Sequence, residues 1–555
     1  MYPIHRPKFL MRIGLSLIFA APCVITCILA TSSSWARPAF RLDDALPTAA
    51  EAARFLKQST WGPTVDLIAH VETVGFERFL DEQFDAPISS YPTLPLVPST
   101  APEDCPALTV CRRDNYTLYP VQTRFFANAL YGEDQLRQRV AFALHQIFVV
   151  SGIDIGQGYP SRFTPYLQVL DRDAFGNFRQ LLNDITLNPA MGNYLDMANN
   201  NKANPNENYA REILQLFTIG LNQLNPDGSL VRDAQGQTVP TYDQTTVNAF
   251  ARVFTGWTFA AAQTTGIANY IDPLRVANAN NHDTGTKTLL RGVVLPANQS
   301  AAKDLSDGLN NIFRDPNVGP FIGRQLIQHL VTSNPSPAYI GRITRVFNDN
   351  GSGERGDLKA VVKAILLDPE ARGVQDSQSG HLMHPVLLIT TLLRAFNARS
   401  ADGMGQSDGY LNPQSQNMGM DVFSPPSVFS YFSPFGGVPG SSLRGPEFGI
   451  LNTSTALRRG NFVNTMVFSR IAVGANYPYN PNGTSLDFSS FLPLAGSPED
   501  LVDSLNTLMM SSQMSPEMRS SILTAVRAVA SSNPLKRVRT AVYLIATSSQ
   551  YQVVR

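Results

Sequence analysis

Apolar residues recur every three or four positions along most of this 555-residue sequence, and this spacing constrains the fold more than any other feature. Within residues 131–150, for example, Leu136, Val140, Leu144 and Phe148 lie four positions apart, which places them on one face of a helix. The same spacing predicts helices over residues 48–84, 175–188, 204–220, 243–255, 299–313, 317–331, 337–348, 356–367, 383–397, 497–512, 515–531 and 534–549. The sequence therefore predicts an all-α fold.

Strand signals are scarce by comparison. The only good one is T-L-L-R-G-V-V-L, residues 288–295, which predicts a small hairpin that turns at Arg291-Gly292. Two stretches lack helical periodicity: residues 86–118 are rich in proline, and residues 400–445 are rich in glycine, proline, serine and aromatic residues. We therefore expect a large multi-helix globular domain with one small β-hairpin and long irregular loops.

These patterns divide the chain into five parts. We expect a signal segment (1–36), a linker (37–47), a main helical domain (48–396), a loop segment rich in glycine, proline and aromatic residues (397–445) and a C-terminal helical region packed on the main domain (446–555). The main domain begins at Thr48, which forms a plausible capping box with Glu51. A hydrophobic fraction of 43% and a charged fraction of 16% are typical of a globular protein rather than a disordered one.

The first 36 residues have the pattern of an export signal. Three basic residues precede the apolar run 13–30, and S-W-A, residues 34–36, places small residues where a signal peptidase cleaves. A retained membrane anchor is the alternative, because the apolar run is nearly long enough to span a bilayer, but Pro22 favours cleavage after Ala36. We therefore expect a periplasmic or extracellular protein with no stable membrane span after cleavage.

The charge balance argues against nucleic acid as a partner. The sequence has 44 basic and 44 acidic residues, and removal of residues 1–36 leaves 41 basic against 44 acidic residues. No basic patch or long charge run interrupts this balance.

Two cysteines remain after the signal segment, Cys105 and Cys111 in C-P-A-L-T-V-C. In an exported chain, two cysteines this close together most simply form a disulfide across a short loop. A metal site needs more ligands than this stretch holds, because no histidine or further cysteine lies nearby. We therefore predict a disulfide here and no metal.

The helix predicted over residues 204–220 begins with an unusual polar cluster, formed by Glu207, Asn208, Arg211 and Glu212. One interpretation is structural: Glu207 and Arg211, like Asn208 and Glu212, are four apart and can pair along a helix, and Gly220 can end it. The other interpretation is functional, because the amide-rich turn before the helix places backbone donors near two carboxylates. Both stay open at this point.

N-H-D-T-G-T-K, residues 281–287, is the second candidate. His282 beside Asp283 can transfer protons or supply half of a metal site, and Lys287 can hold an anionic group. A neutral histidine on a loop is more often a hydrogen-bonded structural residue. The same caution applies to His145, which lies close to the apolar row of its predicted helix.

Aromatic residues form a third candidate. Trp257 and the aromatic side chains of residues 421–435 can make a flat platform for sugar rings. Filling a core beneath a long loop is the commoner fate of such residues, and we favour it.

Familiar catalytic templates are missing from the sequence. It contains no H-E-x-x-H, no Walker loop and no G-x-G-x-x-G that precedes a helix after a strand. The known metalloprotease and nucleotide-binding mechanisms therefore have no motif support.

Several of these stretches together resemble the bacterial family called domain of unknown function 1800. The matching pieces occur in the family's order at residues 52–64, 136–148, 205–220, 254–259, 281–287 and 384–396. The resemblance implies an exported, mostly helical protein whose gene often lies beside that of an exported sulfatase-like protein, a possible partner. One position departs from the family: relatives often have a second histidine two residues after His145, where this chain has Ile147.

Two functional hypotheses follow. The first is a hydrolase or lyase that acts on a carbohydrate polymer, with Glu207, Glu212, His282 and Asp283 in acid-base roles and with Asn208, Arg211, Trp257 and Lys287 binding the substrate. The same carboxylates and imidazoles could instead hold a divalent metal, and the cofactor is unknown. The second hypothesis is a non-catalytic surface or matrix assembly protein with a buried polar network. An open cleft that contains Glu207, Arg211 and His282 favours the enzyme, and a sealed, fully paired cluster favours the assembly protein.

Overall fold

The structure is a computed structural model that describes residues 46–155, 158–264, 266–373, 379–474 and 478–555. Residues 46–555 belong to one compact unit. The expected signal segment 1–36 and all but the end of the expected linker lie outside the described residues. Within the ranges described, no helix combines the length and the apolar character needed to cross a membrane.

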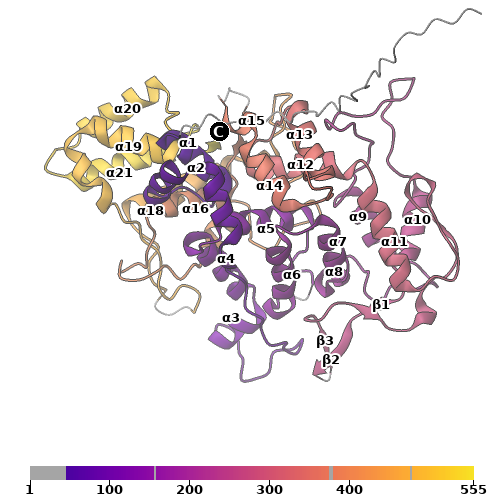
Figure 1. The fold of residues 1–555 in the computed structure, drawn as a ribbon. Coiled ribbons are helices and arrows are strands. Elements are labelled where there is room, and N and C mark those ends of the chain that lie inside the picture. The colour runs from indigo at the N-terminus through magenta and orange to yellow at the C-terminus, as the bar shows by residue number, and fades with distance from the viewer. Residues whose placement is uncertain (1–45, 156–157, 265, 374–378, 475–477) are drawn as a thin grey trace, which may run out of the picture. The chain divides into compact units, whose positions relative to one another are not determined.

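The described residues are mostly helical, as the sequence predicted (Figure 1). The first helix, α1 (Ala49–Ser59), begins at the predicted capping box, in which Thr48 and Glu51 bond each other's backbone amides. It packs against α2 (Val65–Asp85), which is kinked at Gly75, where φ is 78°.

Helix α5 (Gln135–Ile147) lies in the middle of the fold. It contacts α2, α4 (Tyr119–Tyr131), α6 (Pro160–Asp173) and α12 (Val318–Leu330), and each of its side chains is buried. The apolar row from Leu136 therefore has partners on several sides. The buried polar residues of α5 extend to both of its ends.

The other helices connect this centre to the rest of the chain. They are α3 (Val110–Tyr116), α7 (Phe178–Thr186), α8 (Pro189–Tyr194), α9 (Asn208–Gln215), α10 (Gln244–Val253), α11 (Ala301–Arg314), α13 (Pro337–Asn348), α14 (Leu358–Leu367), α15 (Pro369–Arg372), α16 (Pro385–Ala395), α17 (Asn412–Asn417), α18 (Thr453–Phe468), α19 (Pro498–Met510), α20 (Pro516–Arg527) and α21 (Pro534–Ala546). Short 3-10 helices are η1 (Ala279–Asn281), η2 (Leu290–Gly292), η3 (Pro446–Ile450), η4 (Ser489–Phe491) and η5 (Pro493–Gly496). The sequence pattern missed α3, α4, α6, α8, α15, α17 and α18.

The described residues also contain small two-stranded sheets, all of them antiparallel. The predicted hairpin forms from β5 (Lys287–Thr288) and β6 (Val294–Leu295), with η2 at its turn. The other pairs are β1 (Trp257–Thr258) with β4 (Arg275–Val276), β2 (Ala260–Thr264) with β3 (Ile267–Asn269), and β7 (His381–Leu382) with β8 (Val553–Val554). These strands have two to five residues, which is too short for a periodic pattern to show in the sequence.

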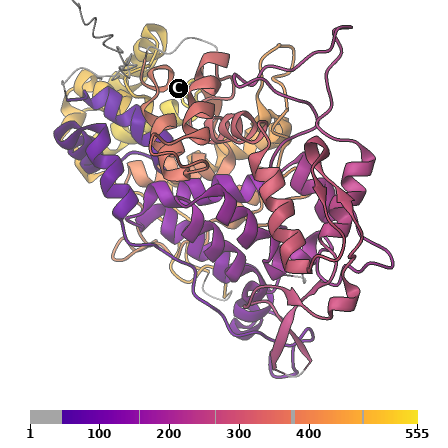
Figure 2. The ribbon, with the colours of Figure 1, turned by 45° about the vertical axis from the view of Figure 1, so that its right-hand side comes forward.

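Distant parts of the chain meet on the N-terminal side of the fold. Helix α19 packs against α1 (Figure 1). Strand β8 pairs with β7 to form a sheet. Helices α19 to α21 lie together in both views, apart from the segment that contains α9 and α10 (Figures 1 and 2). The C-terminal helical region thus shares the core of the main helical region.

The predicted disulfide is present. Cys105, in the loop before α3, and Cys111, in the first turn of α3, are bonded, with their Cα atoms 5.4 Å apart. Cys105 is buried and Cys111 is exposed.

Candidate functional site

The first candidate segment forms α9 and the turns around it. Its apolar side is buried as predicted, because Tyr209, Ala210, Ile213 and Leu214 all face the core. The helix is shorter than predicted. It ends at Gln215 rather than at Gly220, because a further turn follows, in which the amide of Gly220 bonds the carbonyl of Leu214.

Glu207 and Arg211 form the predicted pair at the start of α9. Arg211 Nη2 lies 2.7 Å from Glu207 Oε2, and their side chains are 40% and 38% exposed. Gln244 of α10 donates to the same Glu207 oxygen at 2.8 Å and accepts from Arg211 at 3.2 Å. An ion pair at this exposure contributes only about 0.3–0.5 kcal/mol, so these contacts fit a solvated helix end.

Asn208 and Glu212 do not form the second predicted pair. Asn208 Nδ2 donates to Asp196 Oδ2 at 2.7 Å instead. Glu212 is partly buried, and its Oε2 has no hydrogen-bond partner among the described residues. Burial raises the pKa of this carboxyl, and the nearby Arg211 opposes the shift only in part.

Two tyrosines lie near Glu212. Burial raises the pKa of Tyr194 and of Tyr242 to about 12, and the charge of Glu212 contributes to both shifts. The Tyr242 hydroxyl also lacks a hydrogen-bond partner in the described parts of the chain. Glu212 is thus the predicted site residue whose surroundings most resemble those of a proton-transfer group.

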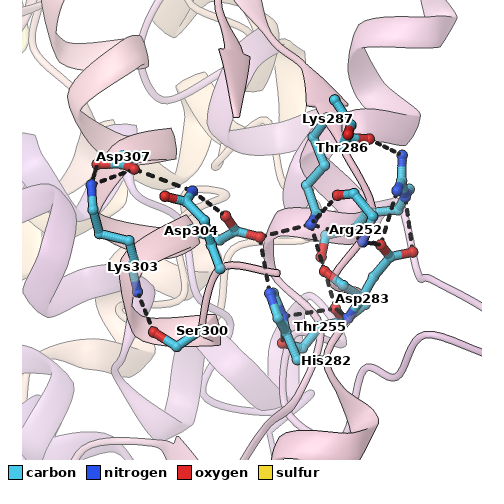
Figure 3. Close-up of polar contacts among 12 residues, drawn as sticks. Arg252, Thr255, His282, Asp283, Thr286, Lys287, Ser300, Lys303, Asp304 and Asp307 are labelled. Carbon is cyan, nitrogen blue, oxygen red and sulfur yellow. Dashed lines mark hydrogen bonds and ion pairs between the residues drawn. The ribbon is translucent and has the colours of Figure 1, made fainter. Parts of the chain in front are cut away.

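His282 is sealed inside the protein, with a side chain only 1% exposed. Its Nε2 lies 2.9 Å from Asp304 Oδ2 on α11, and its Nδ1 lies 2.9 Å from the Thr255 carbonyl oxygen (Figure 3). Both ring nitrogens are therefore occupied by protein groups.

Lys287 enters the same cluster from β5 and is equally buried. Its Nζ lies 2.7 Å from Asp304 Oδ2 and 2.9 Å from the carbonyl oxygen of Gly285, and it also bonds the carbonyl oxygen of Asp283. An ammonium group has three donors, and all three are used here (Figure 3). Lys287 therefore has no free donor for a substrate.

Asp283 turns away from His282 and is held by an arginine. Arg252 Nε and Nη2 each lie 2.9 Å from a different Asp283 oxygen, a bidentate arrangement (Figure 3). The hydrogen bonds from Arg252 lower the pKa of Asp283 to about 2, against the effect of burial. Asp283 is therefore a structural anion rather than a partner that could share a proton with His282.

Asp304 is the centre of the network. Burial by itself raises the pKa of this carboxyl, but hydrogen bonds from His282, Lys287 and Gln299 outweigh it and lower the pKa overall. Its side chain is completely buried. We refer to His282, Asp283, Lys287, Asp304 and Arg252 as the Asp304 network.

Helix α10 contacts both candidate segments, but the two segments do not form one common site. Gln244 contacts Glu207 and Arg211, and Arg252, eight positions later, contacts Asp283. Arg211 reaches the surface, whereas His282 faces inward toward α11. The polar row along α10 was present in the sequence and could have pointed to Arg252, but nothing in the sequence singled out Asp304.

Gly256 lets the segment F-T-G-W-T-F approach His282. Its φ is 93°, and a Cβ at this position would lie 3.0 Å from His282 Cβ. Trp257, which follows it in β1, is only 6% exposed. A sugar could not stack on this ring in the described conformation.

The aromatic residues of the loop segment divide into two groups. Phe423, Tyr431 and Phe432 are buried in the core, as we favoured, whereas Phe429 and Phe435 are 43% and 49% exposed. Phe423 packs against several rings, including that of His145 at 5.2 Å.

His145 is a packed core residue. It is 1% exposed, and its Nδ1 lies 3.2 Å from the Tyr166 hydroxyl. Burial lowers the pKa of its imidazole to about 3. Throughout the described ranges, no three histidine, cysteine, aspartate or glutamate side chains converge in an arrangement that could hold a metal ion.

Comparisons with known proteins give one match. The model of a family described as "Protein of unknown function (DUF1800)" matches residues 54–553. No curated protein and no solved structure matches the chain.

Proposed function

The chain belongs to the DUF1800 family, a family of unknown function, and on that premise we propose that it is an exported, non-catalytic protein of surface or matrix assembly. In this proposal its polar motifs stabilise the packing of a large helical core. Its partner is a surface polymer or an exported sulfatase-like protein. One observation carries the proposal: His282 is 1% exposed and both of its ring nitrogens are bonded to protein groups.

The Asp304 network holds separate segments of the chain together. Asp304 lies on α11, His282 and Lys287 flank the loop between η1 and β5, and Arg252 lies on α10. The network therefore ties three segments together. A buried carboxylate with two cationic or imidazole partners is costly to break, because each partner left behind would be an uncompensated polar group.

The exposed Glu207–Arg211 pair also has a structural role in this proposal. Gln244 links the pair to α10, which also carries Arg252 of the network. The family's polar motifs thus form a continuous set of contacts along one helix. Such a set supports the positioning of α9, α10 and α11 without requiring a substrate.

A second candidate function rests on Glu212. Its Oε2 is buried without a partner among the residues described, burial raises its pKa, and Tyr194 and Tyr242 lie near it. This carboxyl could act as the acid of a hydrolase or lyase on a carbohydrate polymer, with a tyrosine in place of the His282–Asp283 pair.

One experiment separates the two functions. The purified protein and its Glu212→Gln, Glu207→Gln and His282→Ala variants are incubated with a panel of exopolysaccharides. Both polymer binding, by co-sedimentation, and new chain ends, by reducing-sugar and unsaturation assays, are measured.

The assembly proposal predicts that the wild type and Glu212→Gln bind a polymer alike and that no new chain ends form. Glu207→Gln is the matched control, because it lies on the same helix but in an exposed pair. Chain cleavage by the wild type that Glu212→Gln loses and Glu207→Gln keeps would establish the enzyme instead. Absence of both binding and cleavage would reject a polymer as the partner.

A further inference from the structure

A small pocket lies between the loop segment 428–435 and the helices α5, α9 and α12. Its volume is about 10 Å³, which is the room of roughly one water molecule or one hydroxyl group. Its wall consists of two glutamines, Gln146 on α5 and Gln325 on α12, and of seven apolar residues. Among the described residues that form this wall, none is charged. We call it the Phe429 pocket, after the ring at its edge.

Each glutamine of the wall has a buried atom without a hydrogen-bond partner. Gln146 is 8% exposed and Gln325 is 6% exposed, yet Gln146 Oε1 and Gln325 Nε2 bond no residue that the structure describes. Buried polar groups in native proteins are nearly always bonded, so two such atoms in one wall indicate an occupant.

The two atoms also indicate the chemistry of that occupant. The oxygen of Gln146 accepts a hydrogen bond and the nitrogen of Gln325 donates one. A hydroxyl group meets both, because it donates and accepts, whereas a simple cation or anion satisfies only one of the two. An apolar group would leave both atoms buried and unbonded, which is unfavourable. The pocket therefore fits a hydroxyl.

The loop beside the pocket repeats the motif S-x-F three times in succession, beginning at Ser427. In the first copy the Ser427 hydroxyl accepts from the Phe429 amide at 3.2 Å, and in the third the Ser433 hydroxyl accepts from the Phe435 amide at 3.3 Å. The phenylalanine of the middle copy, Phe432, is buried in the core. The repeat thus anchors the loop by its middle ring and holds the other two beside the pocket.

Phe429 and Phe435 both line the pocket and reach the surface, with exposed fractions of 43% and 49%. The Arg444 guanidinium lies 5.9 Å from the centre of the Phe435 ring and covers part of it. No aromatic or cationic side chain of the described residues stacks on Phe429. Its free ring is a flat apolar surface beside a pocket of hydroxyl size, and the CH face of a pyranose packs on such a surface.

We propose that the Phe429 pocket binds one neutral sugar residue of a polysaccharide. The pyranose ring packs on Phe429, and one of its hydroxyl groups enters the pocket between Gln146 and Gln325. The sugar is neutral, because nothing in the uncharged wall would pair with a carboxylate or a sulfate. This inference rests on the proposed role in surface or matrix assembly, and it gives the polymer a chemical class and an attachment point.

Water competes for the same position, since it also donates and accepts. A sugar hydroxyl that replaces a water molecule here keeps both hydrogen bonds, so the exchange costs little. The packing of the ring on Phe429 is then gained in addition. Because two serine hydroxyls already fix the loop backbone at Phe429 and Phe435, little further ordering of the loop is needed for binding.

Retardation of the full protein in native gels tests the proposal. The gels contain dextran, laminarin, hydroxyethyl cellulose or galactomannan as neutral polymers, or alginate as a polyanion. We expect at least one neutral polymer to retard the wild type, with a saturable dependence on polymer concentration, and alginate to leave its mobility unchanged.

A phenylalanine variant connects binding to the platform. Phe429→Ala should weaken binding roughly three- to tenfold, because the sugar loses its packing surface. Phe468→Ala is the matched control, since Phe468 is 41% exposed but lies on α18, outside the pocket wall. This control should bind like the wild type.

Two glutamine variants separate binding from stability. Gln325→Leu should weaken binding roughly tenfold and leave the unfolding midpoint unchanged or raised, because Gln325 Nε2 bonds no described residue. Gln328 lies one turn further along α12 and is also 6% exposed, but it is outside this pocket and its Nε2 bonds the Ser333 carbonyl oxygen at 3.1 Å. Gln328→Leu should therefore lower the midpoint and leave the affinity unchanged.

Several results would overturn the proposal. If Phe429→Ala and Gln325→Leu bind a neutral polymer as the wild type does, the polymer partner stands but the Phe429 pocket is not its site. Retardation by alginate alone would reject the neutral sugar. If no polymer retards the wild type, the site falls together with the polymer partner. Binding of the apolar dye bis-ANS that Phe429→Ala loses, without retardation by any polymer, would assign the patch to a protein partner instead.

Discussion

His282 Nε2 and Asp304 Oδ2 lie 2.9 Å apart in the interior, although 22 positions separate the two residues in the sequence. The contact connects a motif loop to the first turns of α11. It assigns His282 a partner that differs from the neighbouring Asp283, which Arg252 holds. Within the N-H-D motif, His282 therefore bonds the carboxylate of Asp304, whereas the carboxylate of Asp283 bonds Arg252.

Asp304→Asn should destabilise the fold strongly. The change leaves the Lys287 ammonium buried without a carboxylate, which costs about 3–5 kcal/mol in comparable cases. Urea unfolding measures the loss. Asp307→Asn, one turn further along α11, weakens the pair with Lys303 and the 3.3 Å hydrogen bond from Gln299, and it should cost less than about 1 kcal/mol. Equal losses in the two variants would contradict the central role of Asp304.

Asp283 should make the protein sensitive to acid. Its pKa is lowered to about 2 in the fold, so its stabilising effect is present above the unfolded value near 3.8 and is lost as the pH falls toward 2. Asp283→Asn should be roughly 2 kcal/mol less stable than the wild type at pH 7, and the gap should close near pH 2.

A surface pair provides the control for this pH effect. Asp503 pairs with Arg519 in the same bidentate way, at 2.6 and 2.7 Å, but the two side chains are 53% and 36% exposed. Asp503→Asn should change stability by less than about 1 kcal/mol at any pH. A gap of the same size in both variants would show that burial does not strengthen the Asp283 pair.

Glu447 should give the opposite pH dependence. Its pKa is raised from 4.5 to about 8, so the unfolded chain releases this proton before the folded protein does. The wild type should therefore lose roughly 1.4 kcal/mol per pH unit relative to Glu447→Gln between about pH 4.5 and 8. Chemical unfolding of both proteins across this range measures the difference. Parallel profiles would mean that Glu447 is ionised in the fold.

The disulfide should make a modest contribution to the stability of the fold. Closing the short loop between Cys105 and Cys111 stabilises the fold by about 2 kcal/mol in the chain-entropy description. A reductant should lower the unfolding midpoint of the wild type. The Cys105→Ser/Cys111→Ser double variant should start at the lower midpoint and should not respond, and a response in it would assign the effect to another cause.

Gly256→Ala should disturb the Asp304 network through the backbone. The residue has a φ of 93°, and the new methyl group would lie 3.0 Å from His282 Cβ, so we expect a loss of about 2–4 kcal/mol. Gly236 also has a positive φ, 77°, but open space surrounds its Cβ position. Gly236→Ala should therefore cost only about 1 kcal/mol. Thermal unfolding compares the two, and a similar loss would mean that the contact with His282 is easily relieved.

Local signals in the sequence predicted local structure well. The capping box at Thr48, the apolar row of α5, the hairpin at residues 287–295 and the Glu207–Arg211 pair are all confirmed. Each depends on residues close together in the chain, where spacing and chemistry are visible directly. Family membership, which depends on several such pieces in order, is confirmed as well.

The candidate site was harder to predict, because its contacts depend on the tertiary fold. Asn208 and Glu212 have helical spacing, yet Asn208 pairs with Asp196 from a preceding turn. His282 and Lys287 reach Asp304, which the sequence places inside an ordinary helix. Helix α18 was missed for a similar reason, since it packs against α21, which lies far along the chain.

The pairing of β7 with β8 delays the assembly of one part of the core during biosynthesis. His381 leaves the ribosome long before Val554, its neighbouring strand partner in register, exists. Arg459 bonds Gln552 as well as Met383, so its hydrogen bonds are also completed only after the last residues of the chain are synthesised. The sheet of β7 and β8 can therefore be completed only after β8 has been synthesised.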